Sequence, residues 1–395
     1  MTDSSRKLPR TVWLFGLASF FTDIGSEMIV GLLPVFMVGT LHASGTMVGL
    51  VDGVADATSA VLKLFAGQIS DRARRRKPLV LLGYGISTLV RPLVSFAVSP
   101  WQAIVVRGVD RVGKGIRGAP RDALLVDLVE GQGPEVAARA FGVNRALDHA
   151  GAVVGPLLAS GLLWIGFTMP EVFRVAWIPG ALALLCLVLV REKAREPPAS
   201  SSSSWVPVAP PRGLARALPP FAIVAMALAI EPFLLLIARE RGVADPLLPL
   251  VWLVLHVGKS SAAALVPTPS SSSSRQRWLL ASWATAAVGL LACSLAPGVP
   301  LLIAGVVVTG LGSGAREPLE RARVAELAGP GRGGAFGWFH LVTGLAALPG
   351  GLGLGLLWDQ TDPMTTSLAA SALLVIAMAW SAIDARRHVE STPPM

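Results

Sequence analysis

The sequence contains little charge for its length. Only 15% of its 395 residues are charged, whereas 53% are hydrophobic, and the mean hydropathy is +0.61. A soluble domain of this size needs more charge to cover its surface, whereas a lipid bilayer is itself an apolar solvent. The composition therefore excludes an ordinary soluble domain and indicates a chain that lies mostly within a membrane.

Cysteine and enzyme signatures are also scarce. The two cysteines, Cys186 and Cys293, both lie in apolar runs, so neither a disulfide framework nor a cysteine-ligated zinc site is indicated. We find no phosphate-binding loop that ends in Gly-Lys-Ser or Gly-Lys-Thr, and no group of residues with metal-ligand spacing. We therefore expect neither an enzyme nor an ATP-driven pump, and we expect no metal and no cofactor.

In place of charge, the sequence contains apolar runs of about the 20 residues that a transmembrane helix needs. The first run follows Arg10 and contains Asp23 and Glu27, so we interpret it as a span and not as a cleaved signal peptide. We predict an all-α, multi-pass protein of the cell (inner or plasma) membrane with twelve transmembrane helices. The spans are expected near residues 11–39, 46–70, 78–98, 100–128, 140–166, 171–190, 217–238, 246–266, 277–296, 299–320, 334–357 and 364–383.

Basic residues gather in alternate loops, and this alternation predicts the orientation of the chain. One set of loops carries clusters such as Arg72 to Lys77 and Arg191 to Arg195, whereas the other set carries almost none, apart from Arg239 and Arg241. Because cytoplasmic loops are enriched in Lys and Arg, we predict that both termini are cytoplasmic. The net charge of +9 follows from this topology, so we do not infer nucleic-acid binding.

Residues 191–216 are rich in Pro and Ser and cannot bury enough apolar area to fold alone. This predicted cytoplasmic linker divides the runs into two sets of six, in an N-terminal bundle of residues 1–190 and a C-terminal bundle of residues 217–395. A second serine run, Ser270 to Ser274, is predicted to be a flexible loop.

An internal repeat supports the division into halves. Two halves related by an axis along the membrane normal are a known transporter plan. The repeat is clearest where Gly113-Lys-Gly115-Ile-Arg117 in the fourth run recurs as Gly312-Ser-Gly314-Ala-Arg316 in the tenth.

Several stretches resemble the major facilitator superfamily. The loop after the second run reads Gly67-Gln-Ile-Ser-Asp71-Arg72-Ala-Arg74-Arg75-Arg76, which is similar to the family signature between spans 2 and 3. The fifth run contains Gly151-Ala-Val-Val-Gly155-Pro156, similar to the span 5 motif of antiporters, and Arg107 stands at the place of the family's span 4 arginine. With Phe20-Phe-Thr-Asp23-Ile-Gly-Ser26-Glu27 in the first run, the chain resembles a poorly characterised prokaryotic branch of that superfamily.

The resemblance implies two six-helix bundles that rock about a central site open to one side at a time. It also implies that Asp71, within the motif that includes Gly67, Arg72 and Arg75, braces the cytoplasmic side of span 11. The alternative is that these arginines only anchor the topology at the cytoplasmic face. The corresponding loop of the second half lacks the signature.

Charged residues inside the runs need an explanation, because each costs about 2.5–3.5 kcal/mol on insertion scales. Asp23 and Glu27 lie four residues apart on one face of the first run, and Asp56 lies in the second run. Burial and like charge disfavour ionisation of carboxylates, which is the property that a proton carrier needs. These three are therefore candidates for proton coupling; the alternative is structural pairing with bases of the fourth run.

The fourth run carries a stripe of charge about 21 Å long, which cannot face lipid and must line a wet cavity or pair with acids. Arg117 and Arg121 are predicted to belong to a cytoplasmic gate. Arg91 in the third run is expected to snorkel to the outer surface. The candidates for the substrate cavity are Arg107, Asp110, Arg111 and Lys114 of the stripe, Asp148 of the fifth run and Glu231 of the seventh.

Taken together, these features predict a secondary active transporter that moves a small solute by alternating access. The leading hypothesis is proton-coupled transport, as in an antiporter that exports organic or drug-like compounds. One alternative is transport of an anionic solute, such as an organic acid or a metal chelate, attracted by the basic stripe. Another is a non-transporting membrane receptor or scaffold. The expected partners are the lipid bilayer, the solute and protons, and we expect a monomer.

Overall fold

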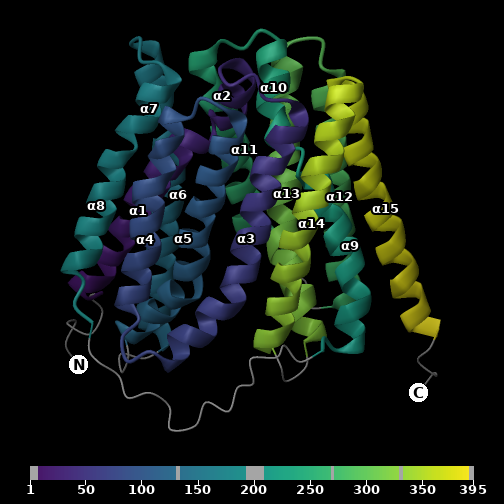
Figure 1. Cartoon of the computed structure of the whole chain (residues 1–395). Coiled ribbons are helices and arrows are strands. Elements are labelled where there is room, and N and C mark those ends of the chain that lie inside the picture. Colours follow the sequence, from purple (N-terminus) through teal and green to yellow (C-terminus); the bar gives the residue numbers. More distant parts are fainter. Residues whose placement is uncertain (1–7, 130–133, 193–208, 268–270, 329–331, 391–395) are drawn as a thin grey trace. The chain divides into compact units, whose positions relative to one another are not determined.

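The computed structural model describes residues 8–129, 134–192, 209–267, 271–328 and 332–390 (Figure 1). Every regular element in these ranges is a helix, as the apolar runs predict. Ten helical segments of the described residues are long and apolar enough to cross a membrane. Two further helices, α3 (Gly45–Arg72) and α5 (Pro100–Asp127), contain 28 residues each but carry the charges of the second and fourth runs. The predicted all-α membrane fold is confirmed.

The chain divides into two compact units. The first consists of Met1–Leu33 and Thr58–Ser203, and the second of Pro34–Ala57 and Ser204–Met395. The units differ from the predicted bundles in residues 34–57, which group with the C-terminal part of the chain, so that α3 contributes to both units. Residues 193–208 of the predicted linker lie outside the described residues.

The first unit is built on α1, which packs against α6 and α8, while α4 packs against α5. Phe15 of α1, Tyr84 of α4 and Leu124 of α5 lie in its buried core. The first unit contains the whole of α5 and residues 58–72 of α3. Its other elements are α1 (Arg10–Val30), α4 (Lys77–Val90), the 3₁₀ helix η2 (Arg91–Phe96), α6 (Pro134–Trp164), α7 (Met169–Val175) and α8 (Trp177–Leu189).

In the second unit, α12 packs against α13 and α15, α11 against α13, and α9 against α14 and α15. Beside the first part of α3, its elements are α2 (Leu33–Gly39), α9 (Arg212–Leu228), α10 (Phe233–Glu240), the 3₁₀ helix η3 (Asp245–Leu247), α11 (Leu248–Leu265), α12 (Ser272–Leu295), α13 (Val299–Leu327), α14 (Arg332–Gln360) and α15 (Pro363–Glu390).

The second serine run corrects a prediction. Instead of forming a flexible loop, Ser272 to Ser274 make the first turn of α12, and Ser271 is its N-cap. The Ser271 Oγ accepts a hydrogen bond from the Ser274 backbone N at 3.2 Å. Serine is among the favoured N-cap residues because its oxygen satisfies a free N–H of the first turn, so the run starts a helix. Ser270 lies outside the described residues.

The glycines of the internal repeat make equivalent contacts in the two units. A Cβ added to Gly113 would lie 2.6 Å from the Gly83 O of α4, and one added to Gly312 would overlap the backbone of α12. Likewise, a Cβ on Gly115 would lie 2.6 Å from the Leu62 Cβ of α3, and one on Gly314 would overlap the backbone of α11. The helix α5 therefore packs closely on α4 and α3 through Gly113 and Gly115. In the same way, α13 packs on α12 and α11 through Gly312 and Gly314.

The first run of each half is interrupted near its end. Residues 31–32 separate α1 from α2, and residues 229–232 separate α9 from α10. A proline follows or ends each break, Pro34 in the first and Pro232 in the second, since proline cannot donate the backbone hydrogen bond that continues a helix. The second break places Glu231 in a turn instead of on a helix face.

The two arginines that depart from the charge alternation have partners. The Arg239 Nε lies 3.1 Å from the Asp245 Oδ1. The Arg241 Nη2 donates to the Ser294 backbone O at 3.3 Å. These contacts satisfy part of each guanidinium group. The two arginines still depart from the alternation of charge from which the orientation is predicted.

Candidate functional site

Acidic residues from two helices of the first unit meet in what we call the carboxylate cluster: Asp23 and Glu27 of α1 and Asp148 of α6. Glycines of α6 bring the two helices together. A Cβ on Gly151 would lie 3.1 Å from the Asp23 Cβ, and one on Gly155 would lie 2.9 Å from the Glu27 Cβ. The carboxylates of Asp148 and Glu27 are close enough to Asp23 to act on it electrostatically. The span 5 motif thus positions the acids of the first run.

Asp148 is buried, and its polar contacts are long. Its side chain is 10% exposed. The Oδ2 atom lies 3.7 Å from the Arg121 Nη1 and 3.8 Å from the Arg145 Nη1, longer than the roughly 2.7–2.9 Å of a good charge-assisted hydrogen bond. Within the described part of the chain, the buried Oδ1 has no hydrogen-bond partner. An unsatisfied buried acceptor costs about 1–3 kcal/mol.

A line of neutral polar groups leads from the cluster into the core. The Asn144 Nδ2 lies 3.5 Å from the Asp148 Oδ2, and the Ser19 Oγ donates to the Asn144 Oδ1 at 3.3 Å. The Tyr84 OH lies 3.3 Å from the Ser19 Oγ. Isolated Ser and Asn residues within apolar runs carry no clear signal, so the sequence did not reveal this line. The one available signal is Tyr84, the only tyrosine in the chain.

The charge stripe of α5 splits into two sets of contacts. On the buried side, the Arg91 Nε and Nη2 donate to the Asp110 Oδ1 at 3.1 and 3.0 Å, and the Arg107 Nη1 lies 3.5 Å from the Asp110 Oδ2. Arg107 is 5% exposed and Asp110 1%. The expectation that Arg91 snorkels to the outer surface is wrong: it is buried, because Asp110 and the Thr22 carbonyl bind its guanidinium within the unit.

Arg117 is also held inside the first unit. Its Nη1 donates to the Ser87 Oγ at 2.6 Å, and its guanidinium lies 4.4 Å from the centre of the Tyr84 ring. In contrast, Lys114 is exposed. It is attracted electrostatically by Asp23 and repelled by Arg111 and Lys63. Of the two predicted gate residues, Arg117 therefore binds α4, whereas Arg121 approaches the carboxylate cluster.

The other predicted site residues lie on or next to α3 and α6. Asp56 is exposed on the part of α3 that belongs to the second unit, and Arg75 is exposed just after α3. Arg72 ends α3 and is partly exposed. Pro156 lies inside α6, one residue after Gly155. The side chains of Gly67 and Asp71 lie outside the described residues.

The second unit holds a mixed-charge cluster. The Lys259 Nζ of α11 donates at 2.5 Å to the Oε2 of Glu231, which lies in the break between α9 and α10. On α13, the Arg316 Nη1 donates to the Glu320 Oε2 at 2.8 Å, and the Trp283 Nε1 donates to the Glu320 Oε1 at 3.2 Å. Glu231 was a candidate for contact with the solute; the structure gives it a partner on a neighbouring helix.

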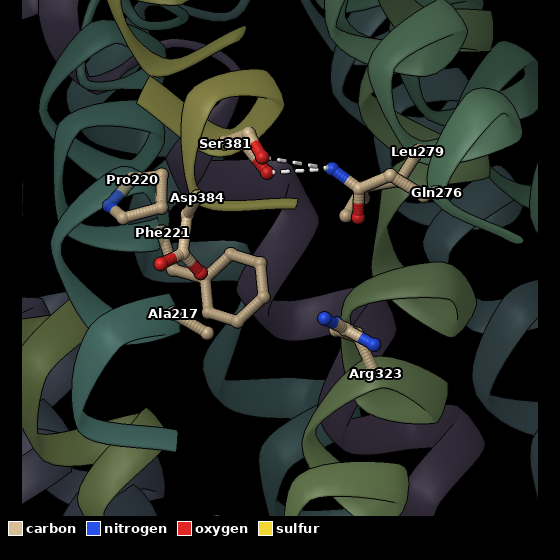
Figure 2. A pocket seen from close by; sticks show the side chains of 8 residues that line it. All are labelled: Ala217, Pro220, Phe221, Gln276, Leu279, Arg323, Ser381 and Asp384. Atoms are coloured by element: carbon tan, nitrogen blue, oxygen red, sulfur yellow. Dashed lines mark hydrogen bonds between the residues drawn. The ribbon is translucent and has the colours of Figure 1, made fainter. Parts of the chain in front are cut away.

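A small pocket lies at one end of the second unit, between α9, α12, α13 and α15 (Figure 2). Gln276 crosses it and donates to the Ser381 Oγ at 2.8 Å. The space holds about one water-sized group, so we do not assign it to an organic solute. Its lining residues are Ala217, Pro220, Phe221, Gln276, Leu279, Arg323, Ser381 and Asp384.

Comparison with known sequences decides the family. A sequence profile described as Major Facilitator Superfamily matches residues 15–274, more than half of the chain. The chain belongs to the major facilitator superfamily. The resemblance predicted from the loop 2–3 and span 5 motifs is confirmed, and membership of this superfamily supports a role in membrane transport.

Relatives within the superfamily cover nearly the whole chain. An uncharacterised MFS-type transporter of Methanocaldococcus jannaschii is 26% identical over 389 residues, which cover 95% of each chain. The multidrug resistance protein MdtH of Enterobacter sp. is 25% identical over 354 residues, 87% of this chain and 85% of MdtH. Among solved structures, the nucleoside transporter NupG superposes with a TM-score of 0.81 at 14% identity, covering 95% of this chain and 100% of NupG. At that identity the likeness shows the fold alone.

Proposed function

We propose that the protein is a secondary active transporter that couples movement of a small organic solute to protons, and that Asp23 and Asp148 exchange the proton. The observation that carries this proposal is the Asp148 carboxylate, which is buried beside Asp23 with one oxygen lacking a hydrogen-bond partner among the described residues. Glu27 belongs to the same cluster and assists, whereas Asp56, on the part of α3 that groups with the second unit, is not assigned a proton.

The surrounding cations explain how proton binding changes the protein. Lys114 faces Asp23 together with Arg111 and Lys63, and Arg121 faces Asp148. When the carboxylates are ionised, they offset the mutual repulsion of these bases. A proton on Asp148 or Asp23 removes part of that attraction, so the bases of α3 and α5 separate from α1 and α6. Protonation is thereby linked to the relative positions of helices within the first unit, which is the requirement for coupling.

The same proposal includes the topology. The 28 residues of α3 and α5 extend about 42 Å, more than the roughly 30 Å of the hydrocarbon core. On α5, Arg107, Asp110 and Arg121 are paired with charges of the first unit. We take them as the second and fourth of twelve spans, with both termini in the cytoplasm of a cell-membrane monomer. Residues 1–190 and 217–395 act as the two rocking bundles, and Asp71, Arg72 and Arg75 act at the cytoplasmic gate.

The solute is proposed to be an organic, drug-like compound that is exported. The match with MdtH, whose name is that of a multidrug resistance protein, supports this choice. An anionic solute is less well supported than the basic stripe suggested, because Asp110 binds Arg91 and Arg107, and α4 binds Arg117.

Proton coupling can be tested without a labelled solute. The protein is reconstituted into liposomes that contain a pH-sensitive dye, and cationic drugs, nucleosides and organic acids are added in turn. We expect at least one class of solute to cause a proton flux that an uncoupler abolishes and that protein-free liposomes do not show. Solute movement that produces no pH change and is indifferent to the uncoupler would contradict proton coupling.

A further inference from the structure

Three buried polar side chains of the first unit form a chain of hydrogen bonds that ends on Asp148. They are Tyr84 of α4, Ser19 of α1 and Asn144 of α6, and none is more than 2% exposed. The Ser19 Oγ lies 3.3 Å from both the Tyr84 OH and the Asn144 Oδ1. The Asn144 Nδ2 lies 3.5 Å from the Asp148 Oδ2. We call Tyr84, Ser19 and Asn144 the polar triad.

The hydrogen bonds of the polar triad all run in one direction. An ionised carboxylate can only accept, so Asp148 requires the amide N of Asn144 to face it, and the amide O then faces Ser19. The hydroxyl of Ser19 donates to that oxygen. Because this hydroxyl has a single hydrogen, it accepts from the Tyr84 OH. Every donor therefore points towards Asp148, and the last one binds the ionised carboxylate more strongly than the neutral acid.

Charged groups also face Asp148 from the helices around it. Arg121 of α5 and Arg145 of α6 lie 3.7 and 3.8 Å from its Oδ2, and Asp23 of α1 acts on it as a like charge. The two arginines favour the ionised carboxylate, whereas Asp23 favours the neutral acid. Of these contacts, that of the Asn144 amide is the shortest. It orients the carboxylate without adding a further charge to the site.

The internal repeat shows what stands at the same place in the second unit. The spacing between the repeated glycines of α5 and α13 also separates Tyr84 of α4 from Trp283 of α12. Likewise, Asn144 stands two residues after the sequence Ala-Phe-Gly in α6, and Phe339 stands two residues after the same sequence in α14. Trp283 and Phe339 therefore occupy the positions that are equivalent to two members of the polar triad.

In the second unit, aromatic rings fill this junction of three helices. Phe221 of α9 contacts both equivalent residues, because its ring centroid lies 6.2 Å from that of Trp283 and 5.5 Å from that of Phe339, edge to face. Counted from the same Ala-Phe-Gly sequence, the place of Asp148 is taken by Thr343, whose Oγ1 donates to the Phe339 backbone O of its own helix at 2.7 Å. The junction can thus be packed without polar groups, which are costly to bury. The triad accompanies the acid, which indicates that it serves the acid and not the packing.

We propose that Asn144, held in place by Ser19 and Tyr84, is a positioning residue for proton exchange at Asp148. Its amide aims the carboxylate and binds the ionised form, which favours release of the proton. This inference rests on the proposed function, in which Asp148 exchanges the proton. It adds the neutral groups that set the pH at which the exchange occurs.

The first test measures protonation of Asp148 directly and requires no transport. The purified protein in lipid is titrated with acid and base while infrared difference spectra record the carbonyl band of protonated carboxyl groups. The band that Asp148→Asn removes belongs to Asp148. In Asn144→Leu, its midpoint should move to higher pH by about one unit, the shift expected when one hydrogen bond to a charged group is lost. An unchanged midpoint, or the absence of any band that Asp148→Asn removes, would overturn the proposal.

Smaller changes along the triad separate positioning from packing. Ser19→Ala removes the donor that holds the Asn144 carbonyl. Tyr84→Phe removes only a hydroxyl, while the ring keeps its contact with the Arg117 guanidinium. Both should move the midpoint in the same direction by less than Asn144→Leu, whereas Ser19→Thr, which keeps the hydroxyl, should show the wild-type value. Shifts to lower pH would contradict the direction of the chain and overturn the proposal.

Thr88→Val supplies the matched control. Thr88 lies one turn after Tyr84 on α4, is 9% exposed and donates to the Gly180 backbone O of α8 at 3.4 Å. The substitution removes one buried hydroxyl of the same unit without touching the triad, so the midpoint should not move. A shift equal to that of Asn144→Leu would show a general loosening of the unit and overturn the proposal.

Proton-coupled flux in proteoliposomes, measured over the same pH range, separates this inference from the proposed function. We expect the pH dependence of the flux to shift with the Asp148 band in Asn144→Leu, whereas mere damage to the packing would lower the flux equally at every pH. A band that responds to Asn144→Leu in a protein that moves no protons leaves the positioning role standing and removes the proposed function. Coupled flux together with a band that does not respond overturns the positioning role alone.

Discussion

Replacing Asp148 by asparagine should lower flux driven by a pH gradient by on the order of 100-fold, the scale of a lost proton-transfer group. The amide cannot take up a proton at Oδ1, the buried oxygen without a hydrogen-bond partner in the described chain. Because Asn keeps the shape of Asp and can still contact Asn144, the packing of α6 should survive. Solute exchange between compartments of equal pH should continue, since exchange needs no net proton movement.

The measurement is the paired comparison of gradient-driven flux and equilibrium exchange in proteoliposomes. Asp23→Asn should show the same separation of the two rates. Asp245→Asn is the matched control, because that carboxylate is 42% exposed and bound to Arg239 outside the cluster. Coupled transport that survives both cluster substitutions would remove Asp23 and Asp148 as the proton carriers.

Replacing Asp110 by asparagine should be the most destabilising single change in the first unit. The substitution leaves Arg91 and Arg107 buried without the charge that binds them. Removing one partner of a buried pair typically costs about 3–5 kcal/mol. For a unit of this size, that cost corresponds to a fall in melting temperature on the order of 10 °C.

Tryptophan fluorescence during heating in detergent measures this effect. Asp122→Asn, on the same helix, is the control: its carboxylate is 52% exposed and forms a surface pair with Arg121, which contributes about 0–1 kcal/mol. If the two variants melt at the same temperature, the buried ion pairs do not stabilise the first unit, and the account of Arg107 and Asp110 as structural residues fails.

The all-α membrane fold could be predicted because it rests on composition, and the repeat because glycines recur at matching positions of the two halves. An apolar run of about 20 residues has few alternatives to a membrane helix, and the repeated glycines of the fourth and tenth runs mark close packing. The boundary between the units could not be predicted, because α3 is one continuous helix whose two parts have different neighbours. Sequence spacing says which residues share a face, but not which helix that face meets.

The same limit explains the errors and omissions at the site. The charges of α5 form one arc in sequence, yet their partners divide between Asp110 and the carboxylate cluster, which spacing cannot reveal. Arg91 was assigned to the outer surface because its partner lies 19 residues away on α5. The hydrogen bond between Ser19 and Asn144 joins residues that are 125 positions apart, so no local pattern reveals it.

The central claim is that ionisable residues of the first unit border an aqueous path inside the membrane. It is tested most directly by comparing Lys114→Cys with Val109→Cys on the same helix, in a chain without native cysteines. Lys114 is exposed and Val109 is 39% exposed, but only the thiol in contact with water can form the reactive thiolate. We predict that a small hydrophilic thiosulfonate modifies Lys114→Cys rapidly and leaves Val109→Cys unmodified. Two equally unreactive thiols would mean that Lys114 faces lipid or packed protein, and the transport mechanism proposed for this cluster would be wrong.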